Sequence, residues 1–206
     1  MQEINLFISY FQCGDKERQK ELDYCFESNK KSGYFANIIN FDNRPTYNDF
    51  FEATKAYPDS INVFANADIY FDDTITSVKD LPKGCAYALT RWELDGDNIV
   101  SFSEKHAYNK EAKPRHSQDV WVFNGTVERV NGDFHIGVAG CDNRIAYEIM
   151  RAGYRLTNPS NVIKCIHKHK EEERNYNVPK GYRNGKVSPP YKWVEVDSNI
   201  KTRKPL

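Results

Sequence analysis

The stretch INVFANADIYFDD, residues 61–73, joins a run of apolar residues to three aspartates. Its β-branched and aromatic side chains predict a buried strand over residues 61–71. Asp68, Asp72 and Asp73 then lie where that strand ends, and water or a metal ion can satisfy carboxylates at such a place. The stretch alone does not decide between the two, so the surrounding sequence has to.

Two strand–helix pairs precede this stretch. Residues 4–11 and 34–41 are apolar and aromatic and predict strands, and each is followed by a segment with helical spacing. The first helix is expected over residues 16–32, and Thr46 is a candidate N-cap for the second. This alternation predicts an α/β fold, a single Rossmann-like domain with a mostly parallel central sheet flanked by helices. Such sheets bind ligands beyond the carboxyl ends of their strands, which is where residues 66–73 lie.

The chain continues less regularly after this stretch. Residues 84–94 and 119–125 predict further strands, separated by a polar loop over residues 95–118 that is long for a compact domain. Two short strands are expected over residues 154–160 and 161–169. We therefore expect the sheet to be completed by strands from the second half of the chain.

The clearest helix of the chain is predicted over residues 142–154, after the glycine-containing loop IGVAG at residues 136–140. Asp142 or Asn143 is expected to cap it. Capping alone explains Asp142, but the glycines also let a ligand approach closely, so a carboxylate on the floor of a site explains it equally well.

The domain prediction places a core over residues 1–170 and a polar tail, acting as a lid or linker, over residues 171–206. Further domains of a longer chain are also an expectation.

Composition narrows the class of function. The 206 residues include 29 basic and 29 acidic side chains, and this balance argues against bulk electrostatic binding of nucleic acid. The five scattered cysteines form no CxxC pair and favour free thiols in a reducing compartment. No apolar run is long enough to cross a bilayer, and the first residues do not resemble a signal peptide. A cytoplasmic protein is therefore expected.

Each candidate site residue has an ordinary explanation when taken alone. Asn66 and Asp68 form an N-x-D motif at a strand end, and Asp119 precedes an apolar strand, where water solvates most such groups. His167 and His169 lie at the end of the last predicted strand, and only one of them is expected to face a site.

The order of these signals is more specific than any one of them. This order resembles the GT-A family of nucleotide-sugar glycosyltransferases. It consists of an acidic strand end with Asp68, a glycine loop GVAG, Asp142 at the start of a helix, and a late His167 or His169. The resemblance covers roughly residues 4–170. It is nearest to compact domains such as the N-terminal domain of a multidomain glycosyltransferase of a large algal virus.

Two departures from the family pattern affect the site. Asn66 stands where the family's D-x-D motif has its first acid, which leaves Asp68 as the main metal ligand. Cys141 stands beside Asp142 where an acidic pair is usual, so only Asp142 can serve there.

The resemblance implies a reaction and a set of roles. Mn²⁺ or Mg²⁺ would be held by Asp68 and one of the two histidines, and Asn66 or Asp72 would assist through water. Asp142 would be the general base of an inverting transfer, and Asp119 would be the reserve base or bind sugar hydroxyls. If the enzyme retains configuration, Asp142 would bind donor or acceptor instead.

The implied substrates are a nucleotide diphosphate sugar, with UDP favoured and GDP or dTDP open, and a glycan or glycoprotein acceptor. Aromatic and cationic residues are assigned around the donor. Those expected at the nucleotide are Ser9, Tyr10 and Phe11; those expected at the phosphates are Arg44 and Arg91; those expected to stack on sugars are Tyr47, Trp92 and Trp121.

Two other classes remain open on the sequence. A metal-dependent phosphoesterase also uses clustered Asp and His, although it normally needs more ligands than this chain offers. A non-catalytic module that binds a nucleotide sugar or a carbohydrate would keep the fold and lose turnover. A dinucleotide oxidoreductase is disfavoured because no GxGxxG follows the first strand.

Overall fold

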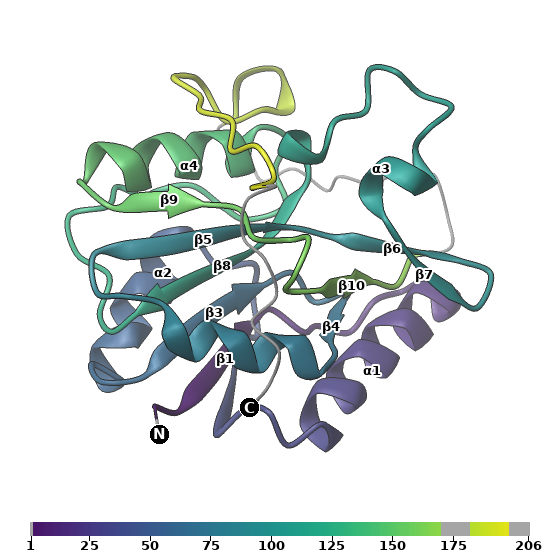
Figure 1. Cartoon of the computed structure of the whole chain (residues 1–206), viewed down its shortest axis with the longest axis horizontal. Helices are drawn as coiled ribbons and strands as arrows, with labels where there is room; N and C mark the ends of the chain where they lie inside the picture. Colours follow the sequence, from purple (N-terminus) through teal and green to yellow (C-terminus); the bar gives the residue numbers. More distant parts are fainter. Residues whose placement is uncertain (1, 170–181, 198–206) are drawn as a thin grey trace.

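The apolar run at the start of the chain forms a strand that is buried at every position, as expected for the interior of a parallel sheet. The computed structural model of the protein describes residues 2–169 and 182–197. Within these ranges the central sheet has six strands (Figure 1). Five of them run in one direction and the fourth in spatial order, β8, is antiparallel to both neighbours. In spatial order they are β2 (Asn37–Asn40), β1 (Ile4–Ile8), β3 (Ile61–Ala65), β8 (Gln118–Asn124), β5 (Cys85–Thr90) and β9 (Arg155–Thr157).

A second, smaller sheet lies beside the carboxyl end of β3. Its strand β10 is antiparallel to β4 and parallel to β6, and β6 forms a hairpin with β7. The four strands in spatial order are β4 (Ile69–Phe71), β10 (Cys165–His167), β6 (Trp92–Asp95) and β7 (Asn98–Ser101).

Local signals in the sequence set the helix ends. α1 (Lys16–Lys31) begins after Asp15, whose carboxylate accepts hydrogen bonds from two backbone N–H groups of the first turn. α2 (Tyr47–Ala53) begins with a capping box between Thr46 and Asp49. The remaining helical segments are η1 (Thr54–Ala56), η2 (Asp73–Asp80), α3 (Phe102–Lys105), η3 (Pro114–His116), α4 (Cys141–Arg151) and η4 (Arg183–Gly185).

Alternate side chains of the central strands enter two separate cores, because successive residues of a strand point to opposite faces. Phe7 and Phe64 pack with α2 and α4 on one face. Leu6 and Val63 pack with β4 and η2 on the other face, where Phe26 of α1 also lies. The sheet is therefore covered on both sides, as Figure 1 shows.

The described part of the predicted tail contributes to the first core. Val187 and Val194 are buried there, and the backbone N–H of Val187 donates to the carbonyl of Ala139. The rest of the predicted tail, residues 171–181 and 198–206, lies outside the described residues. The division at residue 170 stays a prediction.

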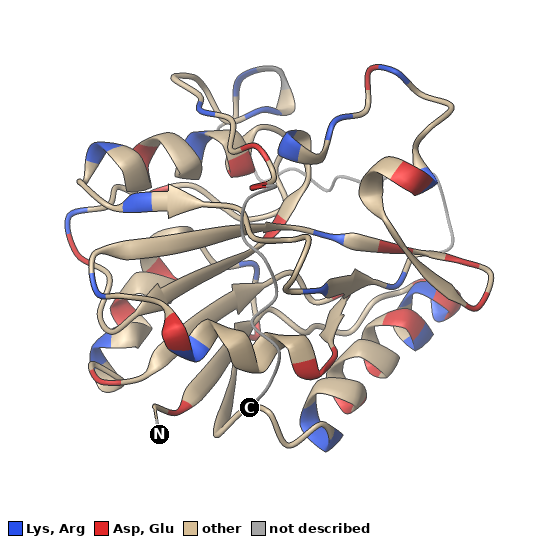
Figure 2. Ribbon diagram, in the orientation of Figure 1, with Lys and Arg blue, Asp and Glu red and all other residues tan. Residues whose placement is uncertain are grey.

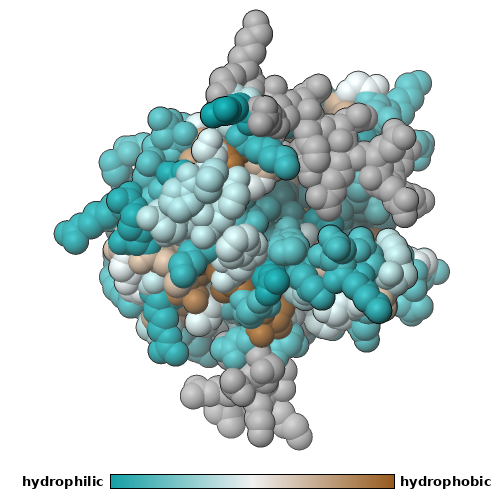
Figure 3. Space-filling model, turned by 90° about the horizontal axis from the view of Figure 1, so that it is seen from above, coloured by the Kyte–Doolittle hydropathy of each residue, from teal (hydrophilic) through white to brown (hydrophobic). Residues whose placement is uncertain are grey.

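The surface carries charges of both signs. Acidic and basic side chains alternate along α1 and are interspersed over the other elements in Figure 2. Seen from above, the face that carries the last described segment is mostly hydrophilic with small hydrophobic patches (Figure 3). Among the described residues no helix is long and apolar enough to span a membrane. All five cysteines are free thiols.

The predicted fold class is confirmed: this is an α/β protein with a mostly parallel central sheet flanked by helices. Four local predictions are wrong. The expected strand over residues 84–94 is divided at Arg91 into β5 of the central sheet and β6 of the second sheet. The expected strand over residues 61–71 breaks at residues 66–68, so that β3 and β4 belong to different sheets. The expected loop over residues 95–118 contains β7, α3 and η3.

The fourth wrong prediction concerns the start of α4. Gly140 is its N-cap, with φ of 82°, and no side chain caps the helix. The capping expectation for Asp142 and Asn143 therefore fails, and Asp142 lies in the first turn of the helix.

Candidate active site

The second sheet brings together three residues that are far apart in sequence. In β10, His167 pairs with Ile69 of β4 on one side and with Glu93 of β6 on the other. Asp68 immediately precedes β4, and its carbonyl accepts a hydrogen bond from the backbone N–H of Lys168. Cross-strand neighbours lie within side-chain reach, so the register of β10 places His167 between two carboxylates.

The imidazole of His167 contacts both carboxylates. Its Nε2 lies 3.3 Å from Asp68 Oδ2, and its Nδ1 lies 3.1 Å from Glu93 Oε2. Burial would lower the pKa of His167, but Asp68 and Glu93 raise it to about 9. Burial would raise the pKa of Glu93, but His167 and Arg91 lower it to about 2. Burial would also raise the pKa of Asp68, but His167 and Arg18 hold it well below its usual range.

Arg18 of α1 closes the cluster from the other side. Its Nη2 donates to Asp68 Oδ2 at 2.5 Å and its Nη1 donates to Glu21 Oε2 at 2.9 Å. His169 joins this group, since its Nδ1 lies 2.8 Å from Arg18 Nη1 and 3.1 Å from Glu21 Oε2. The expectation that only one histidine faces the site is therefore wrong, because the rings of His167 and His169 are 5.6 Å apart at one cluster. His169 lies two residues beyond the end of β10.

A buried ion pair extends the cluster towards the central sheet. Arg91 Nε donates to Glu93 Oε1 at 2.6 Å, and its Nη1 donates to Asp119 Oδ2 at 3.3 Å. The other carboxylate oxygen of Asp119, Oδ1, accepts from Asn66 Nδ2 at 2.7 Å. Burial would lower the pKa of Arg91, but Asp119 and Glu93 raise it. One continuous polar network thus connects seven residues, in the order Asn66, Asp119, Arg91, Glu93, His167, Asp68 and Arg18.

The structure shows the partners of three residues with predicted roles. The side-chain amide of Asn66, expected to assist Asp68 at the metal, donates a hydrogen bond to Asp119. Arg91, expected at donor phosphates, is 9% exposed and is held between two carboxylates. Asp72 caps η2 through the backbone N–H of Thr74.

Two features of Asp68 and His167 fit a divalent cation. Asp68 Oδ1 is buried and has no hydrogen-bond partner in the described structure, which is costly unless something else satisfies it. Glu93 holds the other ring nitrogen of His167, as carboxylates do behind metal-ligating histidines. No group of three or more His, Cys, Asp or Glu side chains within residues 2–169 and 182–197 is arranged to hold a metal. Other ligands would therefore have to come from substrate or water.

A small cavity lies next to this network, between β3, β8, α2 and α4. Its polar lining consists of Asn66, Gln118, Asp119 and Asp142. Asp142 Oδ1 accepts a hydrogen bond from the Cys141 thiol at 3.3 Å. The apolar lining comes from Tyr47, Phe50, Phe64, Ala65, Trp121 and Ile136. The fold thus joins the two predicted acids Asp119 and Asp142, which are 23 residues apart in the printed sequence.

The residues predicted at the nucleotide follow β1, the neighbour of β3. The Ser9 hydroxyl donates to the carbonyl of Asn43, next to Arg44, which is half-buried. Tyr10 stacks on Phe26 with 4.7 Å between ring centroids, and its hydroxyl donates to Asp23. Phe11 is 43% exposed. Of these two aromatic rings, Phe11 therefore has the more accessible face.

The aromatic residues predicted to stack on sugars lie mostly in the core. Tyr47 and Trp121 are 3% exposed and pack edge to face. The indole N–H of Trp92 donates to the carbonyl of Ser160, and the Lys164 ammonium lies over its ring. Only Tyr47 and Trp121 touch the small cavity, as part of its wall.

Sequence reasoning missed Arg18, Glu21, Glu93 and Gln118. Arg18 and Glu21 look like solvated charges on a helix surface, so nothing local marks them. Glu93 interrupts the apolar run LTRWEL, and Gln118 starts one; a charge inside a predicted buried strand is a usable signal.

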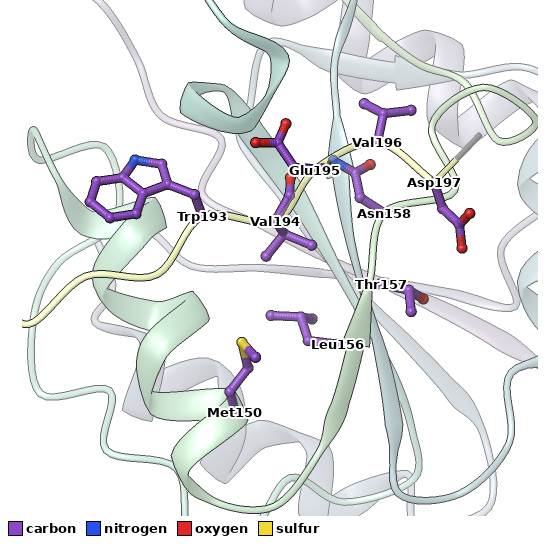
Figure 4. A pocket seen from close by; sticks show the side chains of 9 residues that line it. All are labelled: Met150, Leu156, Thr157, Asn158, Trp193, Val194, Glu195, Val196 and Asp197. Carbon is purple, nitrogen blue, oxygen red and sulfur yellow. Dashed lines mark hydrogen bonds between the residues drawn. The ribbon is translucent and has the colours of Figure 1, made fainter. Parts of the chain in front are cut away.

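A larger cavity of about 360 Å³ lies between α4, β9 and the last described segment (Figure 4). It is lined by Met150, Leu156, Thr157, Asn158, Trp193, Val194, Glu195, Val196 and Asp197, and contains no predicted site residue. The small cavity has a volume of only about 10 Å³, but it is lined by the predicted residues Asn66, Asp119 and Asp142, so we take it together with the network as the candidate site.

Comparisons with known proteins give distant structural likeness. No model of a known protein family matches the chain, and no curated protein matches it. Among solved structures, a mannosyltransferase from Pyrobaculum calidifontis in complex with GDP-mannose and Mn²⁺ is similar, with 12% identity and a TM-score of 0.47. The likeness covers 87% of this chain and 58% of that protein. A likeness this distant concerns the fold and carries no conclusion about what the chain binds.

Proposed function

We propose that the protein is a metal-dependent glycosyltransferase of the GT-A type. It moves a sugar from a nucleotide diphosphate sugar, with UDP favoured, to a hydroxyl of a glycan or glycoprotein acceptor. The observation that carries the proposal is the meeting of Asp68, with its unsatisfied Oδ1, and His167, held by Glu93, beside a cavity lined by acids. This meeting lies past the end of β3, where open α/β sheets bind ligands.

Asp68 Oδ1 and His167 Nε2 would hold Mn²⁺ or Mg²⁺, which would displace the proton that the raised pKa of His167 otherwise keeps on the imidazole. The donor phosphates would complete the coordination. The ion supplies stabilisation of the negative charge on the leaving diphosphate. Arg18 lies at the same carboxylate and adds a second positive charge there. A guanidinium group pairs well with phosphate oxygens, so Arg18 is suited to contact the diphosphate.

Asp142 is the proposed general base that takes the proton of the acceptor hydroxyl in an inverting transfer. Asp119 is the weaker candidate, because Asn66 engages one of its oxygens and Arg91 the other. A base that must accept a proton is hindered by such pairing. Asp119 instead positions Asn66 and Arg91 between the cavity and the metal ligands.

The nucleotide would lie past the end of β1, with Phe11 stacking on the base and Ser9, Tyr10 and Arg44 lining the pocket. His169 supports Arg18 through their contact. We extend the proposal to a relation with algal-virus domains and to further domains of a longer chain, as the sequence resemblance implies, and to a cytoplasmic location (the host cytoplasm if the protein is viral), which the composition favours.

The test measures thermal stability against UDP-, GDP- and dTDP-sugars, each with and without Mn²⁺. We expect a rise in Tm with one nucleotide class that requires the metal and is lost in Asp68→Asn. Asp73→Asn is the matched control, because this neighbouring acid is exposed and should change nothing. A donor that stabilises the protein equally without metal, or equally in Asp68→Asn, would contradict the role of Asp68.

Transfer or hydrolysis of the stabilising donor, followed by release of its nucleoside diphosphate, then separates the classes. Binding without any turnover would favour a carbohydrate- or nucleotide-binding module. Hydrolysis of simple phosphoesters in place of nucleotide sugars would favour a phosphoesterase.

A further inference from the structure

The small cavity beside Asp142 contains a buried acceptor that the proposed roles leave unused. Gln118 is fully buried at the start of β8, and its Oε1 has no hydrogen-bond partner among the described residues. Its Nε2 donates to the carbonyl of Val194 at 3.1 Å. Since only the amide nitrogen can donate to that carbonyl, this bond fixes which end of the side chain is the oxygen.

An irregularity in the sheet explains why two successive side chains line one cavity. In the pairing of β5 with β8, Leu89 is opposite Val120 but Thr90 is opposite Gln118, so Asp119 is an extra residue on β8. Successive residues of a regular strand point to opposite faces, and a β-bulge removes this constraint. Gln118 and Asp119 therefore both reach the cavity.

The polar lining of the cavity is rich in acceptors. Gln118 offers an amide oxygen, and Asp119 and Asp142 offer carboxylates. The amide nitrogens of Asn66 and Gln118 each give one of their two N–H groups to a protein acceptor, Asp119 and Val194 respectively, so the charge of the lining comes from the two carboxylates. A phosphate, which is itself an acceptor and negatively charged, is disfavoured by such a lining. A hydroxyl group, which donates a hydrogen bond and carries no charge, suits it.

We infer that the cavity is a subsite for one hydroxyl of the transferred sugar and that Gln118 Oε1 accepts its hydrogen bond. The inference rests on the proposed glycosyltransferase function. The inference divides the site into two parts. Asp68 and His167 bind the metal and the diphosphate, and Gln118 binds a sugar hydroxyl. Gln118 then determines specificity for the sugar, because a nucleotide sugar that lacks this hydroxyl leaves the buried Gln118 Oε1 without a hydrogen bond.

The test compares the donor that wild type turns over with its set of monodeoxy analogues, in wild type and in Gln118→Met. We expect wild type to discriminate against one analogue by about 100-fold or more in kcat/KM, as sites built to bind a hydroxyl do. In Gln118→Met, which is similar in size but has no amide oxygen, that discrimination should fall to within about 5-fold, since the unpaired acceptor is gone. Gln118→Glu keeps an acceptor oxygen and should keep part of the discrimination.

Asn158→Ala is the control for loosening of the last described segment. Asn158 Nδ2 donates to the same Val194 carbonyl, but Asn158 does not line the small cavity. This variant should retain the wild-type discrimination, and melting curves establish that each variant is folded.

The outcomes distinguish the two proposals. If wild type neither binds nor turns over any nucleotide sugar, the proposed function fails and the inference fails with it. If wild type is active but Gln118→Met loses the same factor with every analogue, only the inference is overturned. Equal loss in Asn158→Ala would also overturn it, because the effect would then arise from the Val194 contact.

Discussion

At the scale of single residues, the site depends on charges that are paired inside the protein. Asp68, Glu93 and Asp119 are each at most 14% exposed in their side chains, and each contacts a cation or an imidazole. Buried ion pairs contribute little net stability when intact but are costly to break. Substitutions in this network therefore need a readout that separates folding from function.

Glu93→Gln tests whether the contact of Glu93 with His167 strengthens metal binding by this proposed ligand. The amide can still contact His167 but no longer favours a strongly basic imidazole, so we expect Mn²⁺ affinity to fall about 10- to 100-fold. Titration calorimetry or the EPR signal of free Mn²⁺ measures this without any assay of activity. Glu52→Gln, which alters an exposed surface pair, is the control. Unchanged affinity in Glu93→Gln would remove Glu93 from the metal site.

Asp142→Asn and Asp119→Asn separate the base from the positioning residue. We expect Asp142→Asn to lower kcat by about 10²- to 10⁴-fold with little change in donor affinity, as loss of a general base does. Asp119→Asn removes one of the two carboxylates at buried Arg91, so it should lower the free energy of unfolding by roughly 3 kcal/mol. Steady-state kinetics and urea unfolding measure the two effects. The opposite pattern would exchange the roles of the two aspartates.

At the scale of secondary-structure elements, turns and bulges place the site residues. The break after β3 sends Asp68 to the second sheet, the bulge in β8 turns Gln118 and Asp119 to one cavity, and Gly140 begins α4. Each of these features departs from a regular repeat. The regular parts of the central strands form the two cores, whereas regular pairing in the second sheet places His167 beside Glu93.

Gly140→Ala tests the start of α4. Gly140 has φ of 82°, and an added Cβ would lie 2.9 Å from the Tyr191 hydroxyl. We expect a loss of about 1–2 kcal/mol of unfolding free energy from the backbone conformation, with a further loss of transfer activity because Asp142 shifts. Gly14→Ala is the control, since its Cβ would meet nothing within 4 Å. Equal stability of the two variants in urea would contradict this account.

At the scale of the whole molecule, the pKa values of the network make stability depend on pH. The pKa of Glu93 is lowered to about 2, so its contribution is complete above about pH 4.5 and disappears as the pH falls towards 2. The pKa of His167 is raised to about 9, so its contribution is complete below about pH 6.5 and is lost as the pH rises through 9. Metal-free protein should therefore gain most from the network between about pH 4.5 and 6.5.

Urea unfolding in EDTA at pH 3, 5.5 and 9.5 measures this profile. The difference in unfolding free energy between wild type and His167→Gln should shrink from pH 5.5 to pH 9.5, on the order of 2–3 kcal/mol. A difference that stays constant over this range would mean that His167 is not charged in the folded protein.

How much could be predicted from the sequence depends on the range of the interactions. The alternation of β1, α1, β2, α2 and β3 follows from local apolar periodicity and capping residues, and the predicted fold class is confirmed. Asp68 and Asp142 were recognised as candidates because acids at strand ends and helix starts are local patterns. Arg18 and Gln118 could not be recognised from the sequence, because they interact with Asp68 and Val194, which are 50 and 76 positions away respectively.

The sequence by itself determined the α/β class, the edge of the sheet where the candidate site lies and several of its acids. The tertiary structure decided which groups meet there. It paired Asp68 with His167 and Arg18, engaged both oxygens of Asp119, and left Gln118 Oε1 without a partner among the described residues, in the cavity beside Asp142. The reason is physical. Periodicity and capping act within a few residues, whereas the pairing of buried charges depends on strand register and on a single bulge, which no short stretch of the chain encodes.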